Sequence, residues 1–596
     1  LFMKILPQST KQLIIALFLF VGNVAIGQNQ ADSLNNLAIK LKQKGNYEMA
    51  INLHKKALAI RLKTKNWDKA SDSYNNIATI WVFKNHPDSA LKYYKKSLEI
   101  REKSLPPTHP KLASLYKNIS GVLGRINQYD EAKKIAHKAL RIYQIRKDSV
   151  NIAVTGHLVA NILIKEGDHK KSLNILLNTI DIYERNFGKK SQIIGSLLND
   201  ITRLYIKEKK IQLARLNILR ALSCKTQNFT KLESLSLLST ILYEEKKTKS
   251  ALDAIAKADS LIKRIRKRIT QDKDKIILGS LGSPIYNLAI ELTSQLYVYS
   301  NHQKYLHLCF YYMERNKSNA LLSSIYAKTG QNSPLITTLE AIQKRLTISQ
   351  AALEYHFDKV RGRLTIFVIT SRLVKLCMVP VKNLESLVEK YREYITTIDP
   401  KEFFNTSYLL YSILIKPIEN YLAGIRHLII VNENEVIQIP FYSLLSKKPL
   451  NPYKVSHKLL PYLIKKYVIS YYPSASLAMT FKDTPSKHDL SFTGIAPVKW
   501  KDDKFNPLLM SPLELQEVSK IFQKRNLSQK IFLEKKANKS IIKSGKISTT
   551  FLHISTHGGY ENLEDRQAVG LAFSDGMLNA SEIYEIPKLD VDLLVL

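Results

Sequence analysis

The stretch LNNLAIKLKQKGNYEMAINLHKKALAIR (residues 34–61) decides the fold of the N-terminal half. Small residues such as Ala38 and Ala50 stand where two helices can approach closely, and Tyr47 supplies the bulk between neighbours. Gly45 lies between the two apolar patterns, at the place where glycine commonly ends a helix. The stretch therefore predicts two antiparallel helices that pack as a hairpin.

The same pattern returns along the chain as far as residue 265. Later copies are anchored by Ile77-Ala78, Ile119-Ser120, Val159-Ala160 and Ile201-Thr202, and a weaker sixth copy runs through Leu238 and Ala251. The anchors of the second and third copies, Ile77 and Ile119, are 42 residues apart. Those of the fourth and fifth copies, Val159 and Ile201, are also 42 residues apart. Self-similarity at a fixed period predicts helix pairs that bury their apolar faces against each other, here about six pairs over residues 31–265.

This pattern resembles tetratricopeptide repeats of the longer-period variety, and LPPTHPKLASLYKNI (residues 105–119) is typical of that variety. The resemblance implies an all-α superhelix whose groove takes a protein or peptide partner. We assign residues 28–330 to the array and its closing helices, which include the amphipathic CFYYMERNKSNALLSSI (residues 309–325). A linker follows around residues 327–338.

After about residue 340 the apolar spacing changes from that of helices to that of strands. Strands separated by helices predict an α/β sheet that is parallel at least in part. The expected strands are two in 353–370 with Arg361-Gly362 in the turn, then 373–381, two in 427–445, the start of 467–480, 492–497, 551–559 ending in Gly-Gly, and 591–596. The expected helices are 383–398, 407–422, the end of 467–480, and 511–524 with a cap at Ser511. The continuous apolar run VDLLVL (residues 591–596) suits a strand buried on both faces.

The order of these pieces resembles the CHAT domain, a caspase-like and separase-like cysteine peptidase domain that often follows tetratricopeptide repeats. The matching pieces are MERNKSNALL, LEYHF, LYSILIKPIENYL, IQIPFYSLL, YVISYYPSASL, GIAP, LELQEV, LHISTHGG and LAFSDGMLNASEIYEI. They cover roughly residues 310–596, and we assign 340–596 to this domain. The resemblance implies a multidomain chain with an α/β caspase-like region.

In that family a His-Gly pair at the end of a central strand is catalytic, and it corresponds here to His557-Gly558. The resemblance implies that His557 does acid/base work beside a thiolate and that the backbone N–H of Gly558 helps bind the oxyanion. A histidine that only caps a turn at the end of a strand is the alternative reading of the same residues.

His553 and His557 also have the spacing of two zinc ligands on a helix. The glutamate that should follow the first histidine is missing, and Gly558-Gly559 would break a helix. On a strand, residues four apart lie about 13 Å from each other, too far to share one metal. We expect no metal and no other cofactor.

The nucleophile of the family follows the next apolar strand, in a pattern resembling Ser-Ala-Cys-x-Thr-Gly. In this chain that strand is residues 591–596, so the nucleophile is expected just beyond Leu596 and the sequence is interpreted as a fragment. The cysteines present are Cys224, Cys309 and Cys377, all before His557. We expect all three to be small, half-buried apolar residues and none to be the nucleophile.

Residues 1–27 are interpreted as a signal peptide. Lys4 and Lys11 precede a short apolar run at residues 13–21, and Ala25-Ile26-Gly27 offers the small residues of a cleavage site. The mature chain would then start near Gln28, in the periplasm or outside the cell, with no later membrane span. An uncleaved membrane anchor is the alternative.

The composition excludes several classes of protein. The 596 residues are 45% hydrophobic and 24% charged, with only 20 Gly and 20 Pro, which excludes wholesale disorder and long flexible linkers. Three cysteines exclude a disulfide scaffold. The formal net charge of +39 is spread along the chain without a nucleic-acid-binding module, so we expect solvated helix faces rather than a specific nucleic-acid partner.

Three functions remain open at this stage. The first is an exported cysteine endopeptidase with a His-Cys dyad, whose repeats bind a partner or regulate access. The second is a non-catalytic interaction scaffold with a degenerate CHAT domain. The third and weakest is a protein that binds anionic surfaces through its net charge.

Overall fold

The computed structural model describes residues 27–596 apart from 44–45, 85, 269–271, 318–335, 397–398, 432–438, 454, 479–488, 500–506, 561–568, 580–581, 584–585, 587–588 and 596. The expected leader, Gly45 and most of the expected linker lie outside the described residues. The chain forms two compact units, Leu1–Phe481 and Lys482–Leu596.

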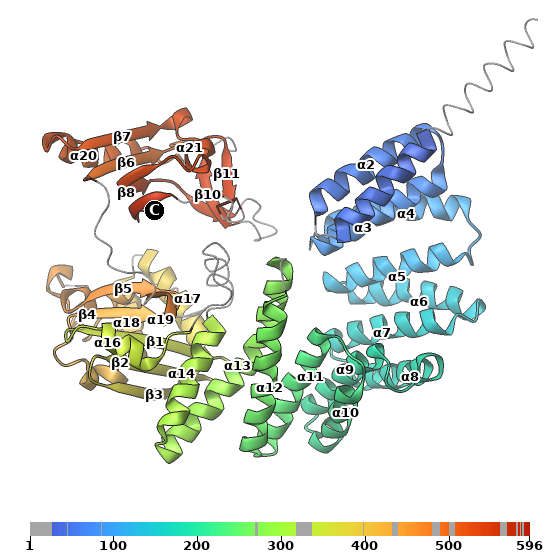
Figure 1. The fold of residues 1–596 in the computed structure, drawn as a ribbon, viewed down its shortest axis with the longest axis horizontal. Coiled ribbons are helices and arrows are strands. Elements are labelled where there is room, and N and C mark those ends of the chain that lie inside the picture. The colour runs from blue at the N-terminus through green and yellow to red at the C-terminus, as the bar shows by residue number, and fades with distance from the viewer. Residues whose placement is uncertain are drawn as a thin grey trace, which may run out of the picture. The chain divides into compact units, whose positions relative to one another are not determined.

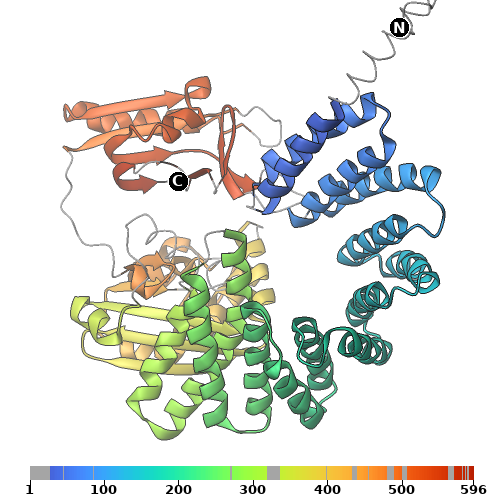
Figure 2. The same ribbon diagram turned by 45° about the vertical axis from the view of Figure 1, so that its right-hand side comes forward.

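The expected helix pairs are confirmed over the described residues (Figures 1 and 2). Six pairs follow one another between residues 27 and 266, and the two helices of each pair pack against each other. They are 27–43 with α2 (Tyr47–Lys63), α3 (Trp67–Phe83) with α4 (Pro87–Ser104), α5 (Pro110–Arg125) with α6 (Tyr129–Ile145), α7 (Ser149–Glu166) with α8 (His169–Phe187), α9 (Gln192–Lys207) with α10 (Ile211–Ser223), and α11 (Asn228–Glu244) with α12 (Thr248–Arg266).

Small residues lie at the close contacts, as the repeat pattern predicts. Ala50 and Ala132 are completely buried, each against apolar residues of neighbouring helices. The turns inside the third and fourth pairs need a left-handed backbone, and Asn127 (φ 63°) and Gly167 (φ 99°) provide it. These residue types adopt that conformation at low cost, so they end the first helix where the sequence places them.

In each of the first two pairs, a buried arginine forms an ion pair that joins the two helices. The Arg61 guanidinium lies 2.6 Å from the Asp32 carboxylate, and Arg101 lies 2.5 Å from Asp72. In both pairs the arginine lies in the last turn of the second helix and the aspartate in the second turn of the first. Because each guanidinium is almost completely buried, its carboxylate partner is needed to offset the loss of hydration.

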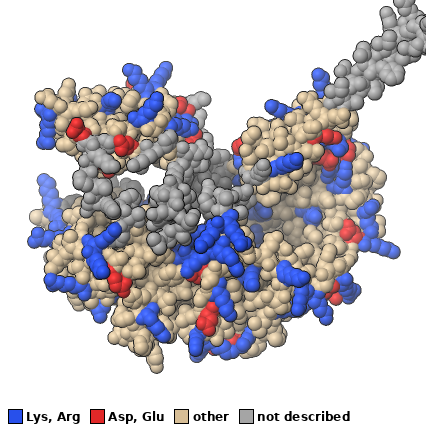
Figure 3. All heavy atoms as spheres, viewed as in Figure 1, with Lys and Arg blue, Asp and Glu red and all other residues tan. Residues whose placement is uncertain are grey.

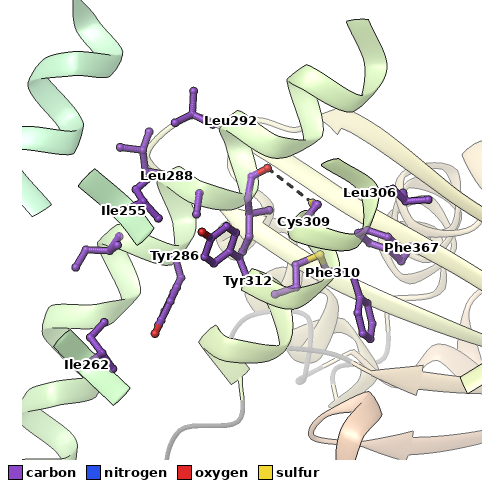
Figure 4. Packing of buried hydrophobic residues seen from close by; sticks show 14 of the residues in the cluster. Ile255, Ile262, Tyr286, Leu288, Leu292, Leu306, Cys309, Phe310, Tyr312 and Phe367 are labelled. Atoms are coloured by element: carbon purple, nitrogen blue, oxygen red, sulfur yellow. Dashed lines mark hydrogen bonds between the residues drawn. The ribbon is translucent and has the colours of Figure 1, made fainter. Parts of the chain in front are cut away.

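The closing helices α13 (Asp272–Ser300) and α14 (Gln303–Lys317) share a hydrophobic core with both the last repeat and the first sheet. Figure 4 shows their shared core, in which the Phe310 ring of α14 lies edge-on to Phe367 of a strand at 5.8 Å. The same apolar cluster includes Ile255 of α12 and Leu292 of α13. The hydrophobic core is therefore continuous from the last repeat into the sheet.

The first sheet has the order β3-β2-β1-β4-β5 in the described chain. Its strands are β1 (Gln350–Asp358), β2 (Arg363–Thr370), β3 (Val374–Pro380), β4 (His427–Val431) and β5 (Val468–Tyr472). The β1–β2 and β2–β3 pairs are antiparallel, whereas β1–β4 and β4–β5 are parallel.

Helices cover both faces of this sheet. Alternate residues of β1 face opposite ways, so Ala352 packs with α14 while Leu353 and Tyr355 pack with the other cover. That other cover consists of α17 (Leu384–Thr396), α18 (Pro400–Leu414) and the 3₁₀ turn Lys416–Leu422. The short α16 (Leu339–Arg345) precedes β1, and the short α19 (Ala475–Ala478) follows β5.

The second unit contains a parallel sheet of order β12-β8-β6-β7. Its elements are β6 (Ser491–Ala496), α20 (Ser511–Lys524), β7 (Ser528–Leu533), α21 (Lys539–Lys543), β8 (Ser548–Ile554) and β12 (Asp590–Val595). A small antiparallel sheet, β11-β10-β9, is built from β9 (Gly558–Tyr560), β10 (Val569–Phe573) and β11 (Gly576–Asn579). The architecture is thus an array of helix pairs followed by α/β sheets, as predicted.

The burial expected for VDLLVL is wrong. The strand exists as β12 and pairs in parallel with β8, but among the described strands it has a neighbour on one side only. Leu593, Leu594 and Val595 remain 48%, 47% and 40% exposed. An apolar run specifies a strand without specifying its place in the sheet, and only a central strand packed on both faces loses all of its exposure.

Three finer expectations also need correction. The second strand expected in 427–445 is not formed over its described part, because Phe441–Ser443 is a 3₁₀ turn after Pro440. The strand expected to end in Gly-Gly ends at Ile554, and the glycines begin β9 in the other sheet. The N-cap of α20 is Met510, and Ser511 is its first residue.

Basic side chains lie on many elements of the face drawn in Figure 3. Along the helices, basic side chains pair with carboxylates: Lys103 lies 2.9 Å from Glu99, and Lys171 lies 2.7 Å from Asp168. In the described part of the chain, no helix combines the length and the apolar character needed to cross a bilayer.

Replacing Ala50 or Ala132 with leucine should overpack the contact between helices. We expect each substitution to lower the free energy of unfolding of the array by about 1–3 kcal/mol. Urea unfolding followed by the helical circular dichroism signal measures this change. Ala59 on α2 is exposed, so Ala59→Leu is the matched control and should stay within about 0.5 kcal/mol. Equal effects at Ala50 and Ala59 would contradict the assigned register of the repeat.

Candidate functional site

The candidate site begins at the carboxyl end of β8, a central strand of the parallel sheet. β8 ends at Ile554, and His557 follows three residues later. The carboxyl ends of parallel strands share one edge of a sheet, which is where α/β folds place ligands. His557 is half-buried in this position and Gly558 is exposed. The structure therefore places both residues at the edge that the sequence predicts.

The backbone around His557 is held by β10. The His557 carbonyl accepts a hydrogen bond from the Ala572 N–H at 2.9 Å, and the Thr556 hydroxyl donates to the Ala572 carbonyl. The Ser555 N–H donates to the Ile495 carbonyl of β6 at 2.9 Å. The segment that carries the histidine is thus tied on one side to the parallel sheet and on the other to the antiparallel one.

The Gly558 N–H points away from β10. In the antiparallel register Gly558 lies opposite Leu571, and the bond from Ala572 to His557 makes this a pair without direct hydrogen bonds. The N–H and C=O of Gly558 therefore face the side of β9 on which no described strand pairs. A Cβ atom built on Gly558 would meet nothing within 4 Å, so the space on the Cβ side of this residue is open.

A polar cluster stands beside this corner and was not found from the sequence. The Ser555 hydroxyl lies 2.9 Å from both the Glu514 carboxylate and the Ser511 hydroxyl of α20. The imidazole of His553 is 3.7 Å from the same carboxylate. The sequence signal was the LELQEV piece, but its spacing alone does not indicate which residue reaches the end of β8.

The three cysteines have the environment of unreactive thiols. Burial raises the pKa of Cys309 far above its ordinary value, and its thiol points at the Ile290 carbonyl. Burial also raises the pKa of Cys224 and of Cys377. Cys309 and Cys224 are buried, at 0% and 8% exposure, rather than half-buried as expected, whereas Cys377 is half-buried. Because the thiolate is the attacking species, these shifts disfavour all three as nucleophiles.

The described residues contain no cluster of side chains suited to binding a metal ion. No group of three or more His, Cys, Asp or Glu side chains there is arranged to hold a metal ion. The argument from strand spacing needs correction, since His557 lies beyond the end of β8 rather than within it.

The array carries a row of polar contacts between the first helices of successive pairs. The Asn76 amide donates to Asn35 at 3.2 Å, and Asn118 donates to Asn75 at 3.3 Å. Further along, the His157 ring lies 2.8 Å from Asp200. Sequence reasoning named no groove residues, because the repeat pattern reports packing and these positions are not part of it.

Family models agree with this architecture. The tetratricopeptide repeat model matches residues 29–103 and 70–145, and the CHAT domain model matches residues 405–596. The chain carries tetratricopeptide repeats followed by a CHAT domain. The CHAT match takes in β4 and β5 of the first unit and the described elements of the second, including His557.

Individual relatives are distant. The clustered mitochondria protein homolog of Brugia malayi is 30% identical over 82 residues, which span 13% of this chain and 6% of that protein. Among solved structures, BtubC from P. vanneervenii has a TM-score of 0.31 at 14% identity over 40% of this chain and 89% of its own. PilF of Pseudomonas aeruginosa has a TM-score of 0.31 at 19% identity over 39% and 93%.

The glycines of the CHAT region differ sharply in the space around them. A Cβ atom on Gly570 of β10 would lie 2.5 Å from the Leu578 carbonyl oxygen of β11. We expect Gly570→Ala to force the two strands apart and to lower the free energy of unfolding by about 1–3 kcal/mol. Gly558→Ala is the control, because its surroundings are open. Thermal unfolding of the two variants tests this, and a larger loss for Gly558→Ala would contradict the register of β9, β10 and β11.

Proposed function

We propose that this protein is a cysteine endopeptidase in which His557 works with a thiolate supplied by a residue that follows β12 in the gene. The observation that carries the proposal is the corner at His557-Gly558. Its backbone is held by two sheets, its histidine lies at the carboxyl edge of a parallel sheet, and its glycine N–H points outward. The CHAT match supports a peptidase-like domain.

In the proposed reaction the thiolate attacks the carbonyl carbon of the scissile peptide bond. The carbonyl oxygen becomes an oxyanion, which accepts a hydrogen bond from the Gly558 N–H. The His557 imidazolium gives its proton to the leaving amine as the C–N bond breaks, and a thioester remains. His557 then takes a proton from water, the hydroxyl adds to the thioester, and the thiolate leaves with the carboxylic acid product formed.

The repeats would bind a protein partner or regulate access to this site. Tetratricopeptide repeats are generally interaction modules, and the row of polar side chains from Asn35 to Asp200 gives the array a surface for such contacts. A non-catalytic scaffold is the second candidate, and the raised pKa values of the three thiols favour it for residues 28–596 alone.

Export completes the proposal. The basic start, the apolar run at residues 13–21 and the small residues up to Gly27 support secretion or delivery to the periplasm.

The protein expressed from its whole gene should cleave peptide substrates, whereas residues 28–596 alone should show no activity above background. His557→Ala should abolish the cleavage, and so should replacement of the cysteine after β12, because the two residues act as a unit.

Gly558→Ala should lower kcat while leaving the thermal unfolding midpoint near that of the wild type, since its surroundings are open. Thiol alkylation should block the reaction.

Absence of a cysteine after β12, or activity that survives His557→Ala, would overturn the peptidase and leave the scaffold. In that case the scaffold function predicts that the His557→Ala variant binds a protein partner as tightly as the wild type does.

A further inference from the structure

A cavity of about 600 Å³ opens between the first two repeats, on the first unit. We call it the Trp67 pocket. It is lined by Leu62, Trp67, Tyr74, Lys96, Glu99, Ile100, Lys103 and Ser104, from α2, α3 and α4. Its volume falls in the range of pockets that take a ligand or an anchoring side chain.

Half of the lining residues are large and apolar or aromatic, although they border solvent. Trp67 is 51% exposed, and Tyr74 is half-buried beside Tyr93, with ring centroids 6.2 Å apart. Trp67 and Tyr74 are seven residues apart, so they share one face of α3. Apolar side chains that gather around a concavity, rather than scattering singly, mark a binding site.

The rim of the Trp67 pocket is basic. Lys96 holds its ammonium over the Tyr74 ring at 5.7 Å from the centroid. Lys103 pairs with Glu99 at 2.9 Å, and within the described residues no carboxylate forms an ion pair with Lys96. A ligand carboxylate placed beside the rings would therefore meet an ammonium that already stands at the edge of the cavity.

We propose that the Trp67 pocket binds an acidic peptide segment of a partner protein, with one aromatic side chain inserted between Trp67 and Tyr74 and a neighbouring carboxylate on Lys96. The apolar walls fit the ring, and the basic rim fits the acid. The proposal deepens the partner-binding role proposed for the array by naming the pocket and the chemistry of the partner. It is independent of peptidase activity.

The next repeat supplies a matched control. Lys138 and Tyr116 stand 42 residues after Lys96 and Tyr74, and the Lys138 ammonium lies 5.5 Å from the Tyr116 ring centroid. Tyr116 is only 8% exposed, its hydroxyl donates to Glu102, and neither residue lines the Trp67 pocket. The same pair of residue types is thus present outside the Trp67 pocket.

The probe is a short synthetic peptide with one phenylalanine between aspartates, and the readout is tryptophan fluorescence of the full chain. The chain has three tryptophans, so Trp67→Phe identifies the part of the signal that comes from the pocket. We expect the peptide to change the Trp67 signal, Lys96→Glu to weaken binding about tenfold, and Lys138→Glu to leave it unchanged. A peptide with alanine in place of phenylalanine should also bind about tenfold more weakly.

Equal binding by wild type and Lys96→Glu would overturn the proposal, and so would equal binding of the alanine peptide or of a single-stranded oligonucleotide. Lys96 is exposed, so its variant keeps the fold and a circular dichroism spectrum checks this. Binding that is lost in Asn75→Ala but kept in Lys96→Glu would overturn the pocket while leaving a partner-binding array in place.

Discussion

The buried polar end of α14 is the constraint on which the first unit depends. Glu314 is completely buried, and its carboxylate accepts hydrogen bonds from the backbone N–H groups of Ala475 and Ser476 at 2.9 and 2.7 Å. Three residues later, the Lys317 ammonium lies 3.0 Å from the Glu354 carboxylate of β1, with both side chains almost fully buried. A buried charge is tolerable only when it is paired, so these contacts hold this part of α14 against β1 and α19.

These contacts make the last helices of the array into a cover of the first sheet. Arg315 turns the other way and lies 3.1 Å from Asp259 of α12. Successive residues of one helix turn therefore reach back to the last repeat and forward to β1 and α19. In the second unit, His557 follows the end of β8 of the parallel sheet, and Gly558 begins β9 of the antiparallel sheet.

The periodic spacing was enough to predict the helix pairs, because it specifies which face of each helix is buried, as Ala50 and Ile77 are. Most of the expected strands form, and the turn at Arg361-Gly362 lies where expected, but β7, β10 and β11 were not predicted. The burial of a strand was not readable, so VDLLVL was expected to be buried on both faces and is partly exposed among the described residues. Long-range polar contacts were missed for a similar reason. Nothing local to Glu514 indicates Ser555, and nothing local to Lys317 indicates Glu354.

The central claim is that the end of the array and the first sheet share one core fastened by α14. Hydrogen exchange of Lys317→Met, Glu354→Leu and the double variant tests it most directly. We expect each single change to lower the protection of α13, α14, β1 and β4 together, by about 3–5 kcal/mol, because it leaves a buried charge unpaired. The double variant should recover most of that loss. Lowered protection in β1 and β4 alone, with α13 and α14 unchanged, would contradict the claim.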